Sequence, residues 1–261
     1  MTAAHLIAFE QRIAALFAAG KLPFLIHLSG GNEAALLELF GRVHAGDWVF
    51  STHRNHYHYL LTAERNGVPR PEAENKLEAL IAAGQSMFVY DRALNFCCSA
   101  ILAGTCGLAA GVAWANREGW NGVGREPHVW CFLGDGAEDE GHFYEAVQFV
   151  EGHGLPCTFV IEDNDRSVET TRADRRGGGR MTGSRRWADY GCVERYEYAP
   201  TWPHGGAACK TMVTFDPAIV AQHAVSCFLD EKPPITEITV APDDRPWTIV
   251  GYVPIPKSQS R

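Results

Sequence analysis

Two apolar runs separated by one helical pattern constrain the fold of this chain most strongly. The runs are His128-Val-Trp-Cys-Phe-Leu133 and Cys157-Thr-Phe-Val-Ile161, each bounded by polar or turn residues. Such uninterrupted runs are typical of strands buried on both faces of a parallel sheet. Between them, Phe143, Val147 and Val150 have the spacing of one amphipathic helix face. Strand, helix and strand in this order predict a βαβ unit, and therefore an α/β fold: a three-layer parallel sheet with helices on both faces.

The length of 261 residues favours one large domain. We expect this domain to span residues 1–240 and a Pro-rich tail to follow over 241–261. Apolar spacing elsewhere predicts further elements. The expected helices are 4–19, one from residue 32, one near 57, 72–83, 99–115 and 217–229, and the expected strands are 48–51 and 235–240.

Composition narrows the class of protein. The formal net charge of −8 argues against broad nucleic-acid binding, which needs a basic face. No apolar run approaches the ~20 residues of a membrane span, and the first residues lack a basic leader before an apolar block, so we expect a cytoplasmic protein without a membrane segment. The eight cysteines lie mostly in apolar runs and form no C-x-x-C pair, which favours reduced thiols over disulfides or a zinc site.

Polar residues follow both predicted strands. Gly134-Asp135-Gly136 ends the first, and Glu162-Asp163-Asn164 ends the second. Gly-Asp-Gly alone is more often a simple turn, but ligands of such sheets bind beyond the carboxyl ends of the strands, where Asp135 and Asn164 become neighbours. A carboxylate, an amide oxygen and backbone carbonyls suit Mg²⁺, which usually completes its octahedron with phosphates. A helix directly after Gly136 would offer free N–H groups to the same anion.

A second polar cluster lies in Phe50-Ser-Thr-His-Arg-Asn-His-Tyr-His58. Single histidines are usually ordinary satisfied polar residues, but four polar groups at 53, 54, 56 and 58 favour a cofactor or substrate role. If this segment is helical, Arg54 and His58 share one face and would point toward a common anion.

These segments together resemble one family. Gly134 through Ala146 and Leu155 through Asn164 resemble the thiamine-diphosphate fingerprint without a gap. The stretch 50–58 is similar to the Ser-Thr-His-Arg-Gly-His-Gly-His segment in alpha subunits of 2-oxo-acid dehydrogenases of the pyruvate, branched-chain and acetoin types. The stretch 27–34 resembles their Gly-Gln-Glu-Ala entry, and Ser86-Met87 and 100–111 resemble segments beside the aminopyrimidine ring. The similarity covers roughly residues 7–165 and implies the thiamine-diphosphate-binding fold.

The resemblance implies thiamine diphosphate and Mg²⁺ as cofactors and assigns residues to them. The implied metal ligands are Asp135, Asn164 and the carbonyl of Arg166. The implied contacts to the cofactor are Gly134, Gly136 and Ala137 at the diphosphate, His53 and Arg54 at the phosphates, and Ala100 and Leu102 beside the pyrimidine. His56 and His58 are the candidates for proton transfer or for recognition of a substrate carboxylate.

By the same resemblance, the chain is the diphosphate-binding alpha subunit of an enzyme that decarboxylates a small 2-oxo acid and transfers the acyl or aldehyde unit. A separate pyrimidine-binding beta subunit would supply the activating glutamate, in an α2β2 assembly. The alternatives are the first half of a split transketolase-like ketol transferase, or a non-catalytic binding subunit. The absence of a Ser-Gly-His-Pro-Gly-Gly stretch disfavours the former, and the presence of Asp135 and Asn164 disfavours the latter.

Two segments depart from the family pattern. Residues 234–240 resemble the last strand of the family, but Ala241-Pro-Asp-Asp follows instead of Arg-x-Gly-His-Ser, so a phosphate-contacting histidine is absent there and His204 is the candidate replacement. The stretch 166–186 carries seven arginines in the place of the family's cofactor-covering loop. It is either a binding loop for a carboxylate or phosphate, or a solvated basic loop.

Overall fold

The computed structural model describes residues 1–22, 26–119, 126–167, 170–176 and 189–202. The predicted helix at 217–229, the predicted strand at 235–240, the tail 241–261 and His204 lie outside the described residues.

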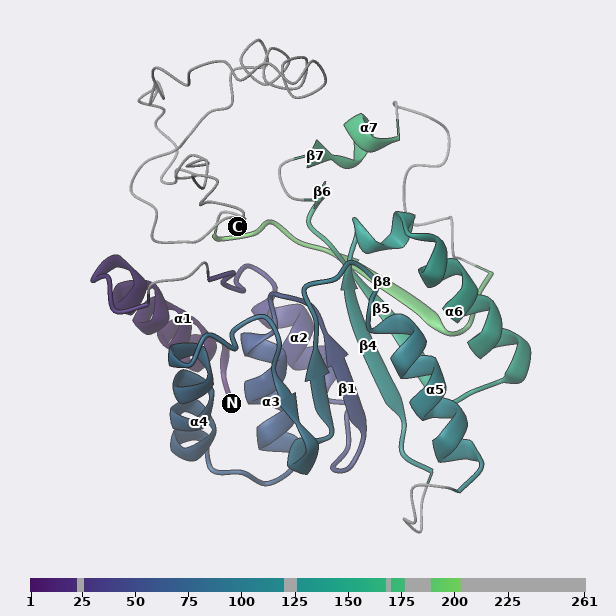
Figure 1. Ribbon diagram of the computed structural model, residues 1–261, viewed down its shortest axis with the longest axis horizontal. Helices are drawn as coiled ribbons and strands as arrows, with labels where there is room; N and C mark the ends of the chain where they lie inside the picture. Colours follow the sequence, from purple (N-terminus) through teal and green to yellow (C-terminus); the bar gives the residue numbers. More distant parts are fainter. Residues whose placement is uncertain (23–25, 120–125, 168–169, 177–188, 203–261) are drawn as a thin grey trace, which may run out of the picture.

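A six-stranded sheet forms the centre of the described chain, in the order β2-β3-β1-β4-β5-β8 (Figure 1). All pairs in it are parallel except β2 with β3, which makes an antiparallel edge. The α/β fold is therefore confirmed, with one antiparallel edge strand added to the expected parallel sheet. The strands of this sheet are β1 (Trp48–Ser51), β2 (Tyr90–Asp91), β3 (Phe96–Cys98), β4 (Val129–Gly134), β5 (Cys157–Asp163) and β8 (Val193–Glu197).

Helices cover both faces of the sheet, with α1–α4 on one side and α5 and α6 on the other (Figure 1). β4 shows why, because its successive side chains point to opposite faces. Trp130 and Phe132 belong to the core under the first group of helices, whereas Cys131 and Leu133 belong to the core under α5 and α6. The helices are α1 (Ala3–Ala18), α2 (Glu33–Phe40), α3 (His56–Arg65), α4 (Arg70–Ala82), α5 (Cys106–Arg117) and α6 (Gly141–His153).

The prediction of a helix from residue 99 was wrong in its first turns. Ala103 has a φ of 52°, a left-handed conformation that a helix does not accommodate, and α5 begins only at Cys106. The preceding residues instead turn above the sheet, leaving Ile101 and Leu102 exposed.

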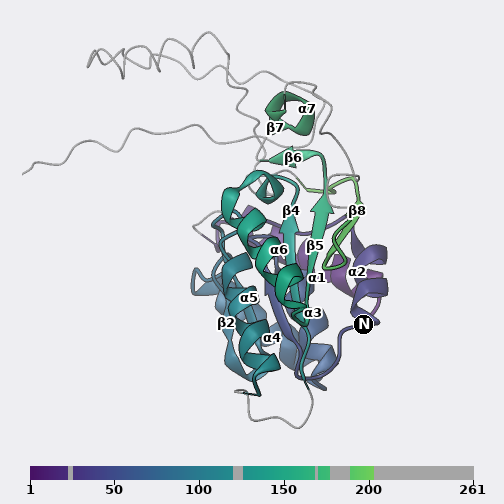
Figure 2. The ribbon, with the colours of Figure 1, turned by 90° about the vertical axis from the view of Figure 1, so that its right-hand side faces the viewer.

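Short elements follow β5 beyond the edge of the main sheet. β6 (Arg166–Ser167) and β7 (Thr170–Thr171) pair antiparallel, and α7 (Arg172–Arg175) follows them. Seen from the side, these elements lie above the carboxyl ends of β4 and β5 (Figure 2). They therefore stand where ligands of open parallel sheets bind.

Two further predictions concern composition. The six cysteines within the described part of the chain are free thiols, and all except Cys97 are buried, as expected. None of the described helices combines the length and apolar character of a membrane span.

Candidate functional site

A cavity of about 430 Å³ opens at the carboxyl ends of β1, β4 and β5. Parallel strands and the turns after them supply most of its wall, together with the segment 198–202 that follows β8. Most of the site residues predicted from the sequence line this one cavity. They are His53, Arg54, Ala100, Leu102, Gly134, Gly136, Ala137, Asn164 and Arg166.

Asp135 lies just behind the cavity wall and is fully buried. Its Oδ2 accepts a hydrogen bond from Arg175 Nη2 at 2.6 Å. Its Oδ1 is buried and has no hydrogen-bond partner among the described residues. Burial raises the pKa of this carboxyl group, and the hydrogen bond and charge of Arg175 only partly offset that effect. A buried carboxylate oxygen without a partner is unfavourable unless a cation or a donor meets it.

Gly136 allows close approach of the backbone next to Asp135. A Cβ atom on Gly136 would lie 2.4 Å from Ser167 Oγ and 2.6 Å from Ser167 Cβ. The absence of a side chain therefore lets β6 pack directly over the β4 turn.

Asn164 stands at the matching position beyond β5. The β4–β5 register pairs Gly134 with Glu162, so the residues that follow leave the sheet side by side. Asn164 Oδ1 accepts from the N–H of Arg166 at 3.0 Å, and its Nδ2 donates to Tyr198 OH at 3.4 Å. The left-handed Asp165 (φ 60°) makes this tight turn possible.

The oxygen donors at these two strand ends suit a hard divalent cation. Asp135 offers an unpartnered carboxylate oxygen, and Asn164 offers an amide oxygen with a second lone pair. Within the described ranges, no group of three or more His, Cys, Asp or Glu side chains could hold a metal. A cation here would thus depend on amide and backbone oxygens and on the ligand it binds, which fits Mg²⁺ better than zinc.

Arg54 and His53 also line the cavity, on the turn between β1 and α3. Arg54 Nη1 donates to the carbonyl of Leu28 at 2.6 Å, and the carbonyl of Arg54 accepts from Ser29 Oγ at 3.2 Å. The ring of His53 packs edge-on against His27, with centroids 4.7 Å apart. The segments 27–32 and 52–54 thus hold each other at the cavity.

The prediction that Arg54 and His58 share a helix face was wrong. α3 begins at His56, so Arg54 precedes the helix and the i, i+4 spacing does not apply. Arg54 lines the cavity, whereas His58 does not. The polar residues at the start of α3 are buried because they contact polar partners from other parts of the chain. The spacing of residues within the segment does not predict such partners.

His56 and His58 are both fully buried. His56 lies between Glu10 Oε1 at 3.0 Å from Nδ1 and Ser86 Oγ at 2.9 Å from Nε2. His58 Nε2 lies 3.2 Å from Glu162 Oε1. Their contacts therefore reach the cavity only indirectly.

Glu162 is the residue that sequence reasoning passed over. It lines the cavity while almost fully buried, and Asn32 Nδ2, His58 Nε2 and the hydroxyl of Tyr196 all meet its Oε1. Its place as the penultimate residue of β5, beside the Asp163-Asn164 pair, was the available signal. Asn32 and Tyr196 come from segments 130 and 34 residues away, so nothing local indicated this cluster.

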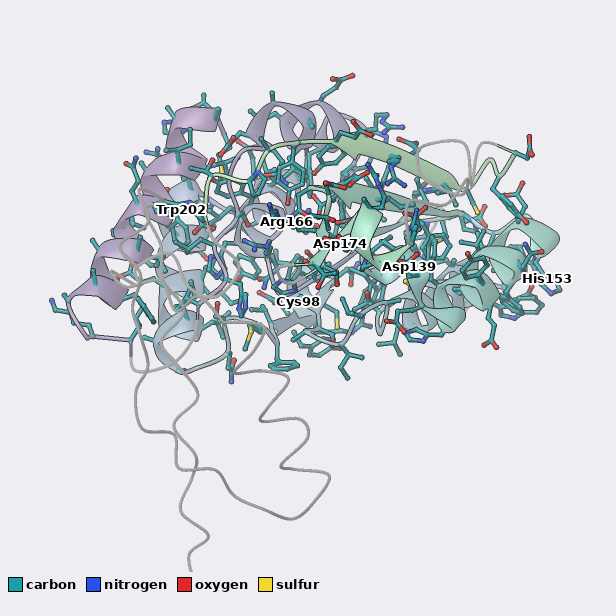
Figure 3. The ribbon with its side chains drawn as sticks, turned by 90° about the horizontal axis from the view of Figure 1, so that it is seen from above. Cys98, Asp139, His153, Arg166, Asp174 and Trp202 are labelled. Carbon is teal, nitrogen blue, oxygen red and sulfur yellow. The ribbon has the colours of Figure 1, made fainter. Side chains whose placement is uncertain are left out.

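The acidic residues after Gly136 meet the arginines of the basic stretch. Glu138 Oε2 lies 3.0 Å from Arg176 Nη2 and 2.9 Å from Arg195 Nη1. Asp139 pairs with Arg175 and Arg176 at 3.2 and 2.8 Å. Seen from above the strand ends, Asp139, Asp174 and Arg166 gather over the middle of the molecule (Figure 3). The described arginines of this stretch that pair with acids are thus docked rather than solvated.

Asp163 joins the same network. Arg172 and Arg195 both ion-pair with its Oδ2, and the N–H of Asp165 donates to its Oδ1 at 2.8 Å. Burial raises the pKa of Asp163, but the hydrogen bond of Arg195 and that of the Asp165 N–H outweigh it, so the pKa lies below its ordinary value.

The predicted helix directly after Gly136 is a short 3₁₀ turn instead. The turn covers Ala137–Asp139, and α6 starts only at Gly141. Glu138 and Asp139 lie in this turn, where they pair with Arg175, Arg176 and Arg195. The N–H groups near the cavity therefore belong to a turn, not to an α-helix.

Comparisons with known proteins show which family the chain resembles in sequence. Residues 1–183 match the family model described as the dehydrogenase E1 component. The chain is 33% identical over 158 residues to the alpha subunit of acetoin:2,6-dichlorophenolindophenol oxidoreductase from Bacillus subtilis (strain 168), covering 60% of this chain and 46% of that protein. It is 31% identical over 166 residues to the same subunit from Cupriavidus necator, covering 63% and 49%.

A third relative is the alpha subunit of the pyruvate dehydrogenase E1 component from Rickettsia prowazekii (strain Madrid E). It is 29% identical over 168 residues, which are 63% of this chain and 50% of that protein. The chain thus spans about half the length of the curated relatives it matches.

Proposed function

The chain belongs to the dehydrogenase E1 component family, and on this premise we propose that it is the diphosphate-binding alpha subunit of a thiamine-diphosphate-dependent enzyme. The proposed reaction is decarboxylation of a small 2-oxo acid, followed by transfer of the acyl or aldehyde unit. A separate beta subunit would complete the active site. The relatives named above are the alpha subunits of an acetoin oxidoreductase and of a pyruvate dehydrogenase E1 component, and both names support an alpha-subunit role for this chain.

One observation carries the proposal. The buried Asp135 Oδ1 has no partner among the described residues, and it stands at the strand end beside Gly136 and opposite Asn164. A divalent cation at this place would satisfy that oxygen and neutralise a diphosphate. We therefore assign Asp135, Asn164 and the carbonyl of Arg166 as Mg²⁺ ligands.

The remaining cavity residues have proposed roles in binding. Gly134, Gly136 and Ala137 would bring backbone N–H groups to the diphosphate, while His53 and Arg54 would contact its oxygens from the turn after β1. Ala100 and Leu102 would line the pyrimidine end. Thiamine diphosphate, once bound, supplies the electron sink for loss of CO₂.

The rim of the cavity supports a partner subunit. Ile101 and Leu102 both line the cavity, yet 68% and 40% of their surface is exposed. Exposed apolar residues at a ligand site often mark a protein interface. We propose that the beta subunit covers this rim and supplies the activating glutamate, in an α2β2 assembly.

Cofactor binding by the chain alone provides the first test. Calorimetric titration should show binding of thiamine diphosphate only when Mg²⁺ is present, and thiamine without its diphosphate should bind far more weakly, because the chain alone carries the diphosphate end of the site. Asp135→Asn should weaken cofactor binding at least tenfold, because an amide oxygen lacks the negative charge of a carboxylate and binds Mg²⁺ more weakly. Glu194→Gln, which removes a surface ion pair with Arg42, is the matched control and should bind normally. Equal binding by the Asp135→Asn variant would refute the proposed site.

Turnover provides the second test. The chain alone should not decarboxylate a 2-oxo acid, and the complex with its beta subunit should. His56 and His58 stay the candidates for a role in turnover, although each is buried. Replacing His58 with Gln should lower kcat more than it weakens cofactor binding, because its partner Glu162 lines the cavity. An unchanged kcat would remove His58 from the mechanism.

A further inference from the structure

Arg175 already supplies a positive charge to the proposed cation site. Its guanidinium donates to Asp135 Oδ2 at 2.6 Å, to Asp139 Oδ2 at 3.2 Å and to the carbonyl of Thr170 at 2.9 Å. Only 14% of the Arg175 side chain is exposed. The pair is thus largely excluded from water. The attraction between its opposite charges is stronger there than it would be in water.

Because Asp135 is buried, its carboxylate needs a positively charged partner. A carboxylate withdrawn from water is costly unless it is paired, and Arg175 provides the pairing in this structure. The other oxygen, Oδ1, has no partner among the described residues, so Arg175 satisfies only half of the group. Oδ1 is therefore the oxygen at which a divalent cation would first meet this carboxylate.

A divalent cation on Oδ1 and the Arg175 guanidinium on Oδ2 would be two positive charges on the same carboxylate, and they would repel each other. Both would bind one small carboxylate in a place with little screening by water. The attachments of Arg175 to Asp139 and Thr170 do not involve Asp135, so the side chain can give up that contact and still be held by α7 and its surroundings.

We propose that Arg175 is a resident counter-ion of the cation site, which a divalent cation must displace from Asp135 when the cofactor is loaded. This inference rests on the proposed function, because it takes Asp135 as a cation ligand. It assigns to the basic stretch a specific role: Arg175 keeps the buried carboxylate neutralised in the absence of the cation and sets how tightly the cation binds.

The alternative is a purely structural ion pair. In that case the removal of Arg175 would lower stability and leave cation affinity unchanged. Competition instead predicts a higher cation affinity, because removal of a competitor strengthens the binding of the remaining ligand. The two readings therefore separate in one measurement.

The experiment is a titration of the full chain with Mn²⁺ alone, following free Mn²⁺ by electron paramagnetic resonance. Arg175→Gln should bind Mn²⁺ at least tenfold more tightly than the wild type. Arg172→Gln is the matched control from the same short helix, since Arg172 pairs with Asp163 and Asp165 instead. It should change the affinity less than threefold.

Unchanged or weaker binding by Arg175→Gln would overturn the inference. Arg175→Lys keeps the charge but lacks the planar guanidinium, and it should bind Mn²⁺ between two- and fivefold more tightly than the wild type. Circular dichroism shows whether the Arg175→Gln variant folds. If it does not fold, an unchanged affinity of the Arg175→Lys variant overturns the inference instead. Failure of the proposed function looks different. The wild type would then not bind thiamine diphosphate with Mg²⁺, while the effect of Arg175→Gln on Mn²⁺ would persist and still depend on Asp135.

Discussion

Replacing Gly136 with alanine should close the cofactor cradle by pushing β6 away from the β4 turn. The added Cβ would lie 2.4 Å from Ser167 Oγ and 2.6 Å from Ser167 Cβ. Rotation about χ1 can move the Oγ atom, but it cannot move the Cβ atom, which the backbone fixes. The backbone around Ser167 must therefore shift.

The size of the effect follows from this overlap. Overpacking of this kind costs about 1–3 kcal/mol. If the cofactor needs the native spacing, the same cost appears in binding, and a tenfold loss of affinity corresponds to about 1.4 kcal/mol. Gly136→Ala should therefore bind thiamine diphosphate with Mg²⁺ roughly 5- to 150-fold more weakly. Strain that the free protein does not relieve by shifting β6 lowers stability instead of affinity, so the melting temperature of this variant should fall by at most about 12 °C, since each kcal/mol shifts a domain of this size by about 2–4 °C.

A double-mutant cycle identifies the cause. Ser167→Gly removes both clashing atoms and leaves Ser167 Cα, at 3.4 Å, as the nearest atom to the new Cβ. The double variant should therefore bind the cofactor more tightly than Gly136→Ala alone, with a coupling of about 1 kcal/mol or more. Calorimetry measures the four affinities and thermal unfolding measures the four stabilities. Wild-type affinity in Gly136→Ala, or no rescue by Ser167→Gly, would refute the reasoning.

Two further predictions concern stability away from the cavity wall. Glu10→Ala should lower the unfolding free energy by about 3–5 kcal/mol, because the Ser29 N–H and His56 Nδ1 lose their buried acceptor. Glu10→Gln keeps an acceptor and should lower the unfolding free energy less. Equal unfolding free energies of the two variants in urea would contradict this reasoning. Burial raises the pKa of Asp91, but the hydrogen bond from Lys76 helps to hold it below its ordinary value. The Lys76–Asp91 pair therefore stabilises the folded protein fully above the unfolded pKa of Asp91, about 3.9, and this stabilisation is lost as pH falls through the lower folded pKa. The loss of unfolding free energy caused by Lys76→Gln, measured by urea unfolding, should be largest near neutral pH and should shrink below about pH 4. A deficit independent of pH would exclude this cause.

The sheet and its site edge were predictable because they depend on local patterns. β4 and β5 appear in the sequence as continuous apolar runs, and the helix between them has clear amphipathic spacing. Parallel pairing then brings Gly134 opposite Glu162, and so the polar residues beyond each strand meet without further information. The same logic places the β1 turn with His53 and Arg54 at this edge.

The errors arose where long-range contacts override local pattern. Helical spacing suggested that Arg54 and His58 act together, but α3 starts at His56 and His58 turns inward to Glu162. Small residues before Cys106 suggested a longer helix, but Ala103 adopts a left-handed conformation that ends the possibility. In the first case the decisive partner lies far along the chain, and in the second the outcome depends on a single backbone angle. Neither feature changes the spacing of apolar residues from which helices are predicted.

The acidic turn and the basic stretch show how two unfavourable local features explain each other. Glu138 and Asp139 beside an anion site are unfavourable alone, because like charges repel. Arginines at 172, 175 and 176 are equally unfavourable when clustered without partners. The fold joins them: Glu138 is buried against Arg176 and Arg195, and Asp139 meets Arg175 and Arg176. Because Asp139 pairs with Arg175, it helps to hold Arg175 on Asp135, so any change that loosens this acidic turn should alter the cation affinity of the strand ends as well.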